Sequence, residues 1–192
     1  MKRLLWLGLT TSLAGSLFGQ EFKVGSKVGD FNLSDLKGST VQYSKLKGDV
    51  TVVMFIATQC PISNDYNERM SAVANDYSSK GVKFVAINAN NTEPAAEVGS
   101  HAAQHKFPFS VYKDAGSVVA DRFGAQVTPE VYVIDKSGTI RYHGYIDDSR
   151  NATNIKVQGL RMALDAVLAG SPVERTETKA FGCTIKRVKR VS

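Results

Sequence analysis

The feature that most constrains this chain is a β-branched, apolar run at residues 49–58 (DVTVVMFIAT), which ends two residues before Cys60. A strand with one face in water alternates apolar and polar residues. This run does not alternate, so it predicts a central strand covered on both faces. Residues 61–79 then change to helical spacing, and residues 82–88 (VKFVAIN) form a second apolar run. Together these segments predict a β-α-β unit with a right-handed crossover.

The rest of the chain extends this pattern into an α/β fold. A short strand is predicted at 41–44, and two strands at 131–135 and 139–145 predict an antiparallel hairpin around a tight Lys-Ser-Gly turn. Two amphipathic helices and a helical turn are predicted at 94–106, 155–169 and 118–123. This order predicts a central mixed sheet with helices on both faces.

The length and composition favour one compact domain. We expect a leader at 1–19, the domain at 20–170 and an extended tail at 171–192 that carries Cys183. Hydrophobic residues make up 43% and charged residues 22% of the chain, which is typical of a globular protein. The net charge is +6, with basic residues gathered near the C-terminus, but no stripe of aromatic residues accompanies them. Nucleic-acid binding is therefore not expected.

The N-terminus has the pattern of an export signal. Met1, Lys2 and Arg3 form a basic segment, and Leu4–Gly19 is an apolar run of 16 residues. That run is shorter than the ~20 residues that a membrane span needs. Cleavage would leave an exported protein, periplasmic or extracellular, without a transmembrane span. An uncleaved anchor is the alternative.

Cys60 has the setting of a reactive thiol. A cysteine at a helix N-terminus faces unpaired backbone N–H groups and the positive end of the helix dipole, which favour the thiolate. Pro61 suits the first helical position, and Ser63 can offer its N–H and its hydroxyl as donors to the sulfur. An inert, buried cysteine at the end of a strand is the alternative interpretation.

Cys183 is the one other cysteine in the chain, so it is the one possible intramolecular partner of Cys60. In an oxidising compartment such a pair could be a simple structural disulfide. The alternative is a redox pair, in which Cys183 resolves a mixed disulfide formed at Cys60. We predict that the tail folds back across the mixed sheet towards the helix start. In the sequence around Cys183, Phe181 could dock the tail and Gly182 could permit a turn.

Three features in this order make the chain similar to the thioredoxin-like superfamily. The apolar strand runs into Cys60-Pro61-Ile62-Ser63; Val127-Thr128-Pro129 precedes the strand VYVID; and that strand turns into a hairpin partner. The chain specifically resembles the exported redoxins related to the alkyl hydroperoxide reductase and thiol-specific antioxidant family. The resemblance implies a cis Thr128–Pro129 peptide beside Cys60.

The chain departs from two family patterns. Peroxiredoxins place a threonine or serine three residues before the cysteine and a proline four before that, where this chain has Ala57 and Val53; Thr58 lies two before Cys60. They also carry an arginine where this chain has Thr128-Pro129. Thioredoxin has Cys at the position of Ser63 and a buried carboxylate at that of Met54. Glu130 is a candidate substitute for that carboxylate as proton acceptor, or else an exposed residue at a strand end.

These observations predict an enzyme, a thiol–disulfide oxidoreductase, with a thiol-dependent peroxidase as the alternative. A non-catalytic metal- or partner-binding module is a second alternative. His101 and His105 have the spacing of metal ligands, but the sequence offers no identifiable third ligand. No metal site is therefore expected. Substrates would be protein or small-molecule disulfides, or peroxides, with an external thiol reductant and no cofactor. Cys60 and Cys183 would be catalytic. The supporting residues would be Thr58, Pro61, Ser63, Thr128, Pro129 and Glu130.

Overall fold

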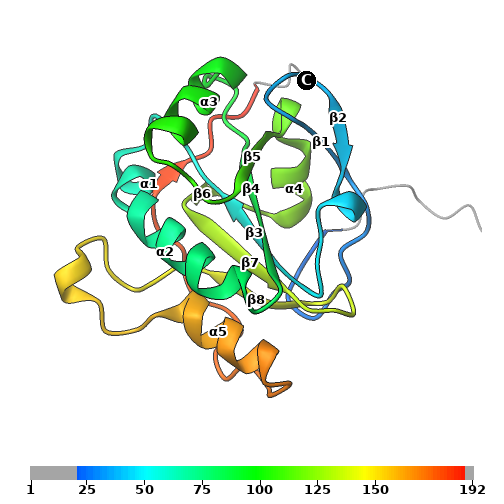
Figure 1. Ribbon diagram of the computed structural model, residues 1–192, viewed down its shortest axis with the longest axis vertical. Coiled ribbons are helices and arrows are strands. Elements are labelled where there is room, and N and C mark those ends of the chain that lie inside the picture. Colours follow the sequence, from blue (N-terminus) through cyan, green and yellow to red (C-terminus); the bar gives the residue numbers. More distant parts are fainter. Residues whose placement is uncertain (1–20, 189–192) are drawn as a thin grey trace, which may run out of the picture.

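A computed structural model describes residues 21–188 and is built around a mixed seven-stranded sheet (Figure 1). The strands of this sheet are β1 (Asn32–Ser34), β2 (Thr40–Gln42), β3 (Val50–Phe55), β4 (Val82–Asn88), β5 (Ser110–Lys113), β7 (Glu130–Ile134) and β8 (Ile140–Gly144). Their order is β2-β1-β5-β4-β3-β7-β8. The three central strands β5, β4 and β3 are parallel, whereas β1, β2, β7 and β8 are each antiparallel to their neighbours.

The helices are α1 (Pro61–Asp65), α2 (Asn67–Ser78), α3 (Ala95–Gln104), α4 (Val118–Phe123) and α5 (Gly159–Leu168). Short 3-10 turns lie at Tyr43–Lys45, Ala115–Ser117 and Ala152–Asn154. A separate two-stranded sheet pairs β6 (Val127–Thr128) with β9 (Cys183–Thr184).

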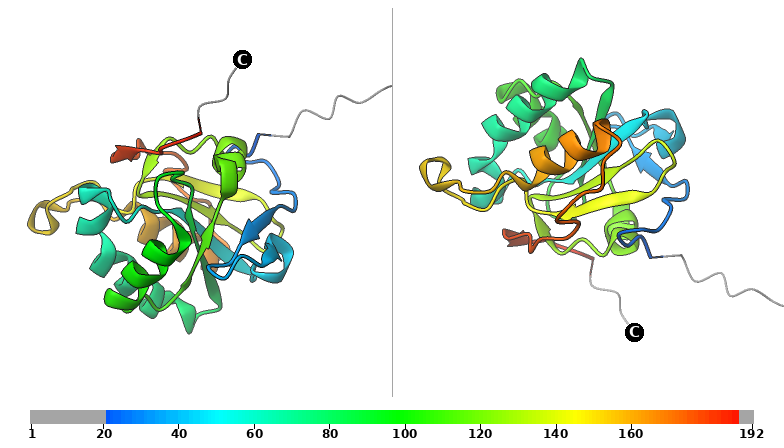
Figure 2. Two further views of the ribbon diagram at one scale, coloured as in Figure 1. Left: turned by 90° about the horizontal axis from the view of Figure 1, so that it is seen from above. Right: turned by 90° about the horizontal axis from the view of Figure 1, so that it is seen from below.

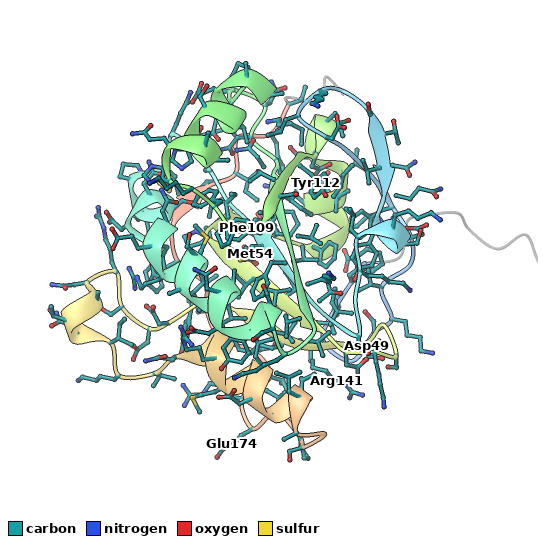
Figure 3. The ribbon with its side chains drawn as sticks, viewed as in Figure 1. Asp49, Met54, Phe109, Tyr112, Arg141 and Glu174 are labelled. Atoms are coloured by element: carbon teal, nitrogen blue, oxygen red, sulfur yellow. A yellow bond between two sulfur atoms is a disulfide. The ribbon has the colours of Figure 1, made fainter. Side chains whose placement is uncertain are left out.

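The absence of alternation in β3 follows from burial on both faces. Val52 and Met54 point into a core shared with α2, α3 and α5, whereas Val53 and Phe55 point into a core shared with α4 and the N-terminal segment. All four are fully buried, and Figure 3 shows Met54 in the middle of the sheet. The views in Figure 2 show helices on both sides of the sheet. The predicted α/β fold with a central mixed sheet is therefore confirmed.

Two helix predictions need correction. The continuous helix predicted at 61–79 is divided at Tyr66, which has a ψ of −4° and separates α1 from α2. The apolar spacing continues across this break, so the sequence gives no sign of it. The helix predicted from 155 begins only at Gly159. The preceding residues are held outside the helix because Asp148 binds the backbone of Lys156 and Val157.

The tail runs back over the molecule to the start of α1, as predicted (Figure 1). It first lies along β8, where the backbone of His143 bonds Thr176 and Thr178, and then pairs with β6 as strand β9. Ile185, just beyond β9, is buried in the core on the α4 side. The described part of the tail is thus held against the sheet and the core.

The predicted leader, residues 1–19, lies outside the described residues. Between residues 21 and 188, no helix has the length and apolarity that a membrane crossing requires.

Candidate active site

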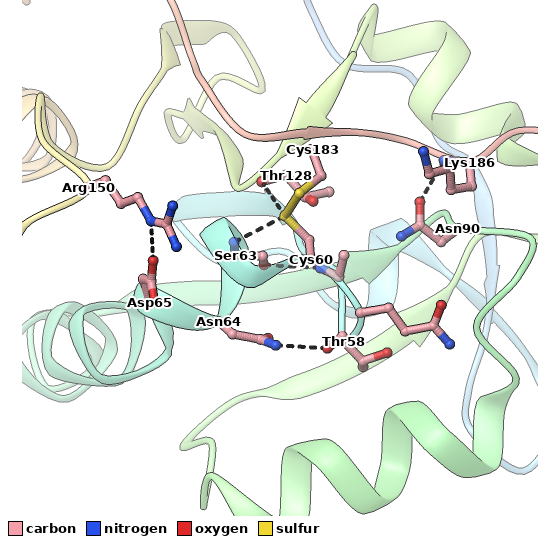
Figure 4. Close-up of a disulfide and its surroundings, with 12 residues drawn as sticks. Thr58, Cys60, Ser63, Asn64, Asp65, Asn90, Thr128, Arg150, Cys183 and Lys186 are labelled. Carbon is pink, nitrogen blue, oxygen red and sulfur yellow. Dashed lines mark hydrogen bonds and ion pairs between the residues drawn. A yellow bond between two sulfur atoms is a disulfide. The ribbon is translucent and has the colours of Figure 1, made fainter.

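Cys60 is the N-cap residue of α1. Its backbone is extended, with φ −93° and ψ 114°, and Pro61 begins the helix as predicted. The backbone N–H of Ser63 donates a hydrogen bond to the Cys60 sulfur at 3.2 Å (Figure 4). Only 3% of Cys60 is exposed. The first turn of α1 therefore directs a backbone N–H at the sulfur, an arrangement that stabilises a thiolate.

Cys183 lies directly against this helix start and forms a disulfide with Cys60 (Figure 4). Their Cα atoms are 5.8 Å apart although 123 residues separate them in the sequence. Strand β9 brings Cys183 there by pairing with Thr128 in β6. The cysteines are thus within bonding reach, as the interpretation of a redox pair requires.

Gly182 permits this approach because it has no side chain. A Cβ atom at this position would lie 2.0 Å from the carbonyl oxygen of Thr128. The chain bends at Gly182, and the glycine is also needed because two backbones approach closely. The expectation for Phe181 is confirmed, since its ring packs edge-on against Tyr66 with centroids 6.2 Å apart.

The Thr128–Pro129 peptide is cis, as the resemblance implied. It lies beside the cysteines: the Thr128 carbonyl oxygen is 3.4 Å from the Cys60 sulfur. The Thr128 side chain is buried, and among residues 21–188 its hydroxyl has no hydrogen-bond partner. Cys60, Cys183 and Thr128 therefore form one compact cluster.

Ser63 donates its N–H to the Cys60 sulfur as predicted, whereas its hydroxyl and that of Thr58 bind other groups. The hydroxyl oxygen of Ser63 accepts a hydrogen bond from the Ala57 N–H at 3.1 Å, so it stabilises the end of β3. The hydroxyl of Thr58 donates to Glu97 at 2.9 Å. Ser63 therefore contacts the sulfur through its backbone, and the Thr58 hydroxyl binds a carboxylate.

Glu130 is buried, with 3% of its surface exposed, so the interpretation as an exposed residue is wrong. Its carboxylate accepts hydrogen bonds from the N–H groups of Gln126 and Val127 and from the Tyr132 hydroxyl, and lies 2.6 Å from His143 Nε2. Burial raises its pKa, but these hydrogen bonds outweigh burial and hold the pKa below the usual 4.5. Glu130 thus fixes the loop that leads into the cis peptide. Its role as a proton acceptor stays a prediction.

Glu93 is a site residue that the sequence interpretation missed. It is 1% exposed, and its carboxylate accepts hydrogen bonds from the N–H groups of Thr58 at 2.8 Å and Gln59 at 3.1 Å, directly before Cys60. The side chains of Asn88 and Asn90 also donate to it. A signal existed: β3 and β4 are parallel, so polar residues after β4 lie beside the residues after β3.

Lys113 completes this polar cluster. Its ammonium donates to the carbonyl oxygens of Asn90 and Glu93 at 2.8 and 2.7 Å and to the Asn88 side chain. Burial lowers the pKa of Lys113, although Glu93 opposes this shift. For Glu93, burial raises the pKa, but the hydrogen bonds from Thr58 and the two asparagines outweigh it, so the pKa lies below 4.5.

The histidines are engaged in packing. The ring of His101 packs against those of His105 and Phe107, and its Nε2 lies 3.2 Å from the Asn67 amide. His143 stacks on Tyr132, with ring centroids 4.3 Å apart, on the side of the sheet that α4 covers. Within residues 21–188, no three His, Cys, Asp or Glu side chains are grouped so that they could hold a metal ion.

Comparison with known proteins places this geometry in a family. The model of the AhpC/TSA family matches residues 24–143, which is more than half of the chain. The chain belongs to the AhpC/TSA family. This match confirms the resemblance seen in the sequence of this AhpC/TSA protein.

This AhpC/TSA protein is similar to a named enzyme and to proteins whose structures have been solved. Thiol-disulfide oxidoreductase ResA of Halalkalibacterium halodurans is 28% identical over 118 residues, which are 62% of this chain and just under two thirds, 66%, of that protein. An uncharacterized conserved protein from Geobacillus kaustophilus is 34% identical, with a TM-score of 0.82 over 88% of this chain and 95% of that one. A putative thioredoxin from Neisseria meningitidis is 29% identical, with a TM-score of 0.61 over 78% and 95%. The named enzyme among these relatives is a thiol-disulfide oxidoreductase, the class that the sequence predicted for this chain.

Proposed function

We propose that this protein is an exported thiol–disulfide oxidoreductase in which Cys60 is the nucleophile and Cys183 its resolving thiol. One observation carries the proposal: Cys183 is brought to bonding distance of a cysteine that caps a helix N-terminus beside a cis-proline. A purely structural disulfide has no need of the N–H of Ser63 directed at its sulfur.

In the proposed reaction, the Cys60 thiolate attacks one sulfur of a substrate disulfide. A mixed disulfide forms and the first substrate thiolate leaves. The Cys183 thiolate then attacks the Cys60 sulfur, the second substrate thiolate leaves, and the Cys60–Cys183 disulfide forms. The substrate has gained two electrons. An external thiol reductant restores both cysteines and is itself oxidised to a disulfide.

The substrates would be disulfides in proteins or small molecules, and the compartment periplasmic or extracellular. The leader pattern at 1–19 supports export, and the domain would extend over 20–170 with the tail at 171–192. Thr128 and Pro129 would form the wall against which the substrate sulfur lies, Thr58 and Pro61 would orient Cys60, and Glu130 would support the wall from behind.

Peroxide reduction is less well supported by the geometry. Thr58 is the hydroxyl residue closest before Cys60 in the sequence, and its hydroxyl donates to Glu97. It is therefore not free to polarise a peroxide. Consumption of hydrogen peroxide in the presence of a dithiol measures this second activity directly, and we expect it to be slow relative to reduction of a protein disulfide.

Trapping with cysteine variants tests the proposal. Cys183→Ala removes the resolving thiol, so mixed disulfides between Cys60 and substrates should accumulate and be released by a reductant. The matched variant Cys60→Ala retains Cys183 but should trap nothing. Mass spectrometry of non-reduced complexes identifies the cysteine involved. Trapping by Cys60→Ala, or its absence in Cys183→Ala, would contradict the assignment of roles.

A further inference from the structure

The side chain of Asn90 connects the tail to the cluster behind Cys60. Asn90 is buried, with 5% of its surface exposed. Its amide oxygen accepts a hydrogen bond from the N–H of Lys186 at 2.7 Å, as Figure 4 shows, and its amide nitrogen donates to Glu93 at 2.7 Å. Lys186 is three residues beyond Cys183. One amide group thus binds the tail on one side and a buried carboxylate on the other.

Glu93 extends this connection to the nucleophile. The carboxylate oxygen that binds Asn90 also accepts the N–H of Gln59, the residue before Cys60, and the other oxygen accepts the N–H of Thr58. The hydrogen bonds therefore form an unbroken path from the backbone before Cys60, through Glu93 and Asn90, to the backbone after Cys183. Both cysteines are positioned by the same short loop that follows β4.

This path matters because no covalent bond links the tail to Cys60 when the cysteines are reduced. Cys183 lies 123 residues from Cys60, and closing so long a loop is entropically costly unless other contacts keep the tail in place. The concentration of Cys183 that Cys60 experiences then depends on how well these contacts form. A buried amide with both of its hydrogen bonds made contributes strongly to that placement.

We propose that Asn90 is the positioning residue that sets the effective concentration of Cys183 at Cys60. The inference rests on the proposed function, in which closure of this disulfide is the resolving step. The side-chain hydrogen bonds of Asn90 go to Glu93 and to the backbone of Lys186, and neither involves a cysteine sulfur. Asn90 therefore acts through the tail backbone. It therefore governs resolution and the stability of the disulfide, while the reactivity of the Cys60 thiol itself is set by α1.

The test compares Asn90→Ala with Asn91→Ala in the full chain. Asn91 is the exposed neighbour, and it contacts Lys186 through its backbone N–H, which alanine retains. Each protein is equilibrated with mixtures of reduced and oxidised glutathione, and the Cys60–Cys183 disulfide is quantified by mass spectrometry. Asn90→Ala leaves the part-buried backbone N–H of Lys186 without its amide partner and removes one hydrogen bond to Glu93, so we expect the equilibrium constant for closure to fall about tenfold. For this two-electron couple that equals a shift of about 30 mV. Asn91→Ala should match the wild type.

A second measurement separates positioning from general damage. In a Cys183→Ala background, the rate of Cys60 alkylation as a function of pH should be the same with and without the Asn90→Ala substitution, because Glu93 keeps its bonds to Thr58 and Gln59. An altered alkylation profile, or an unchanged closure constant, would overturn the inference. If the wild type itself forms no Cys60–Cys183 disulfide in glutathione, the proposed function fails instead, so the two failures are distinguishable.

Discussion

At the scale of residues, two buried carboxylates hold the two loops that meet at the cysteines. Glu93 binds the backbone before Cys60, and Glu130 binds the backbone before the cis Pro129. Each carboxylate accepts hydrogen bonds from backbone N–H groups of these loops. These hydrogen bonds offset the cost of burying a charge. The nucleophile's setting is therefore made by side chains from distant parts of the sequence.

The lowered pKa of Glu93 predicts how stability depends on pH. Its pKa lies below 4.5 in the folded protein, so the unfolded chain binds the proton more readily. The stabilisation is complete above 4.5 and is lost as the pH falls through the folded pKa. Glu93→Gln should lower the free energy of unfolding by about 1–3 kcal/mol at neutral pH, with a smaller difference in acid. Urea unfolding of the oxidised proteins across this range measures it.

The exposed Glu68 on α2 supplies the control, since Glu68→Gln should change the urea curves little at any pH. Parallel pH dependences for the wild type and Glu93→Gln would show that Glu93 does not gain stability from its charge.

At the scale of elements, strand β9 decides whether the two cysteines meet. Its two residues pair with β6, and Gly182 makes the approach possible because Thr128 leaves no room for a side chain. The tail's other attachments, along β8 and through Ile185, support this strand from both ends. The position of Cys183 thus depends on backbone contact as much as on side chains.

Gly182→Ala tests the role of this pairing. The added Cβ would lie 2.0 Å from a backbone oxygen, so strand β9 must shift, and the fraction of Cys60–Cys183 disulfide in a glutathione buffer should fall at least about tenfold. Gly99→Ala in α3 is the matched control, because its Cβ would meet only Leu36 at 3.6 Å. Equal disulfide fractions in the two variants would exclude a requirement for glycine.

The elements also show which sequence patterns were sufficient. The uniform burial of β3 and the start of α1 at Pro61 followed from local composition, and α4 has the predicted bounds, Val118–Phe123. The break between α1 and α2 at Tyr66 did not follow from local composition. Its hydroxyl binds Asp147 and Ser149, in a loop more than 80 residues away, while the apolar spacing on the helix stays regular. A contact so distant in the sequence has no local signature.

At the scale of the whole molecule, the disulfide joins the first half of the chain to its end. It closes a loop across 123 residues that includes most of the sheet. Such a cross-link restricts the unfolded chain, and for loops of this length the stabilisation reaches about 5 kcal/mol. The redox state should therefore be coupled to the stability of the domain.

Chemical unfolding with and without reductant measures this coupling. We expect the oxidised protein to unfold at a higher urea concentration than the reduced protein. Its free energy of unfolding should be greater by up to about 5 kcal/mol. Cys183→Ala should behave like the reduced wild type under both conditions. Equal midpoints for the oxidised and reduced wild type would mean that the disulfide does not stabilise the fold.

The sequence by itself determined the α/β architecture, the position of Cys60 at a helix start and the identity of its possible partner, because these depend on local periodicity, on proline and on the presence of two cysteines. Only the tertiary structure decided that the tail reaches Cys60, that Gly182 is needed for close approach, and that Glu93 and Asn90 join the two cysteines. These features arise where segments far apart in the sequence pack together, and no local pattern of residues specifies which backbone groups will be left for a buried side chain to satisfy.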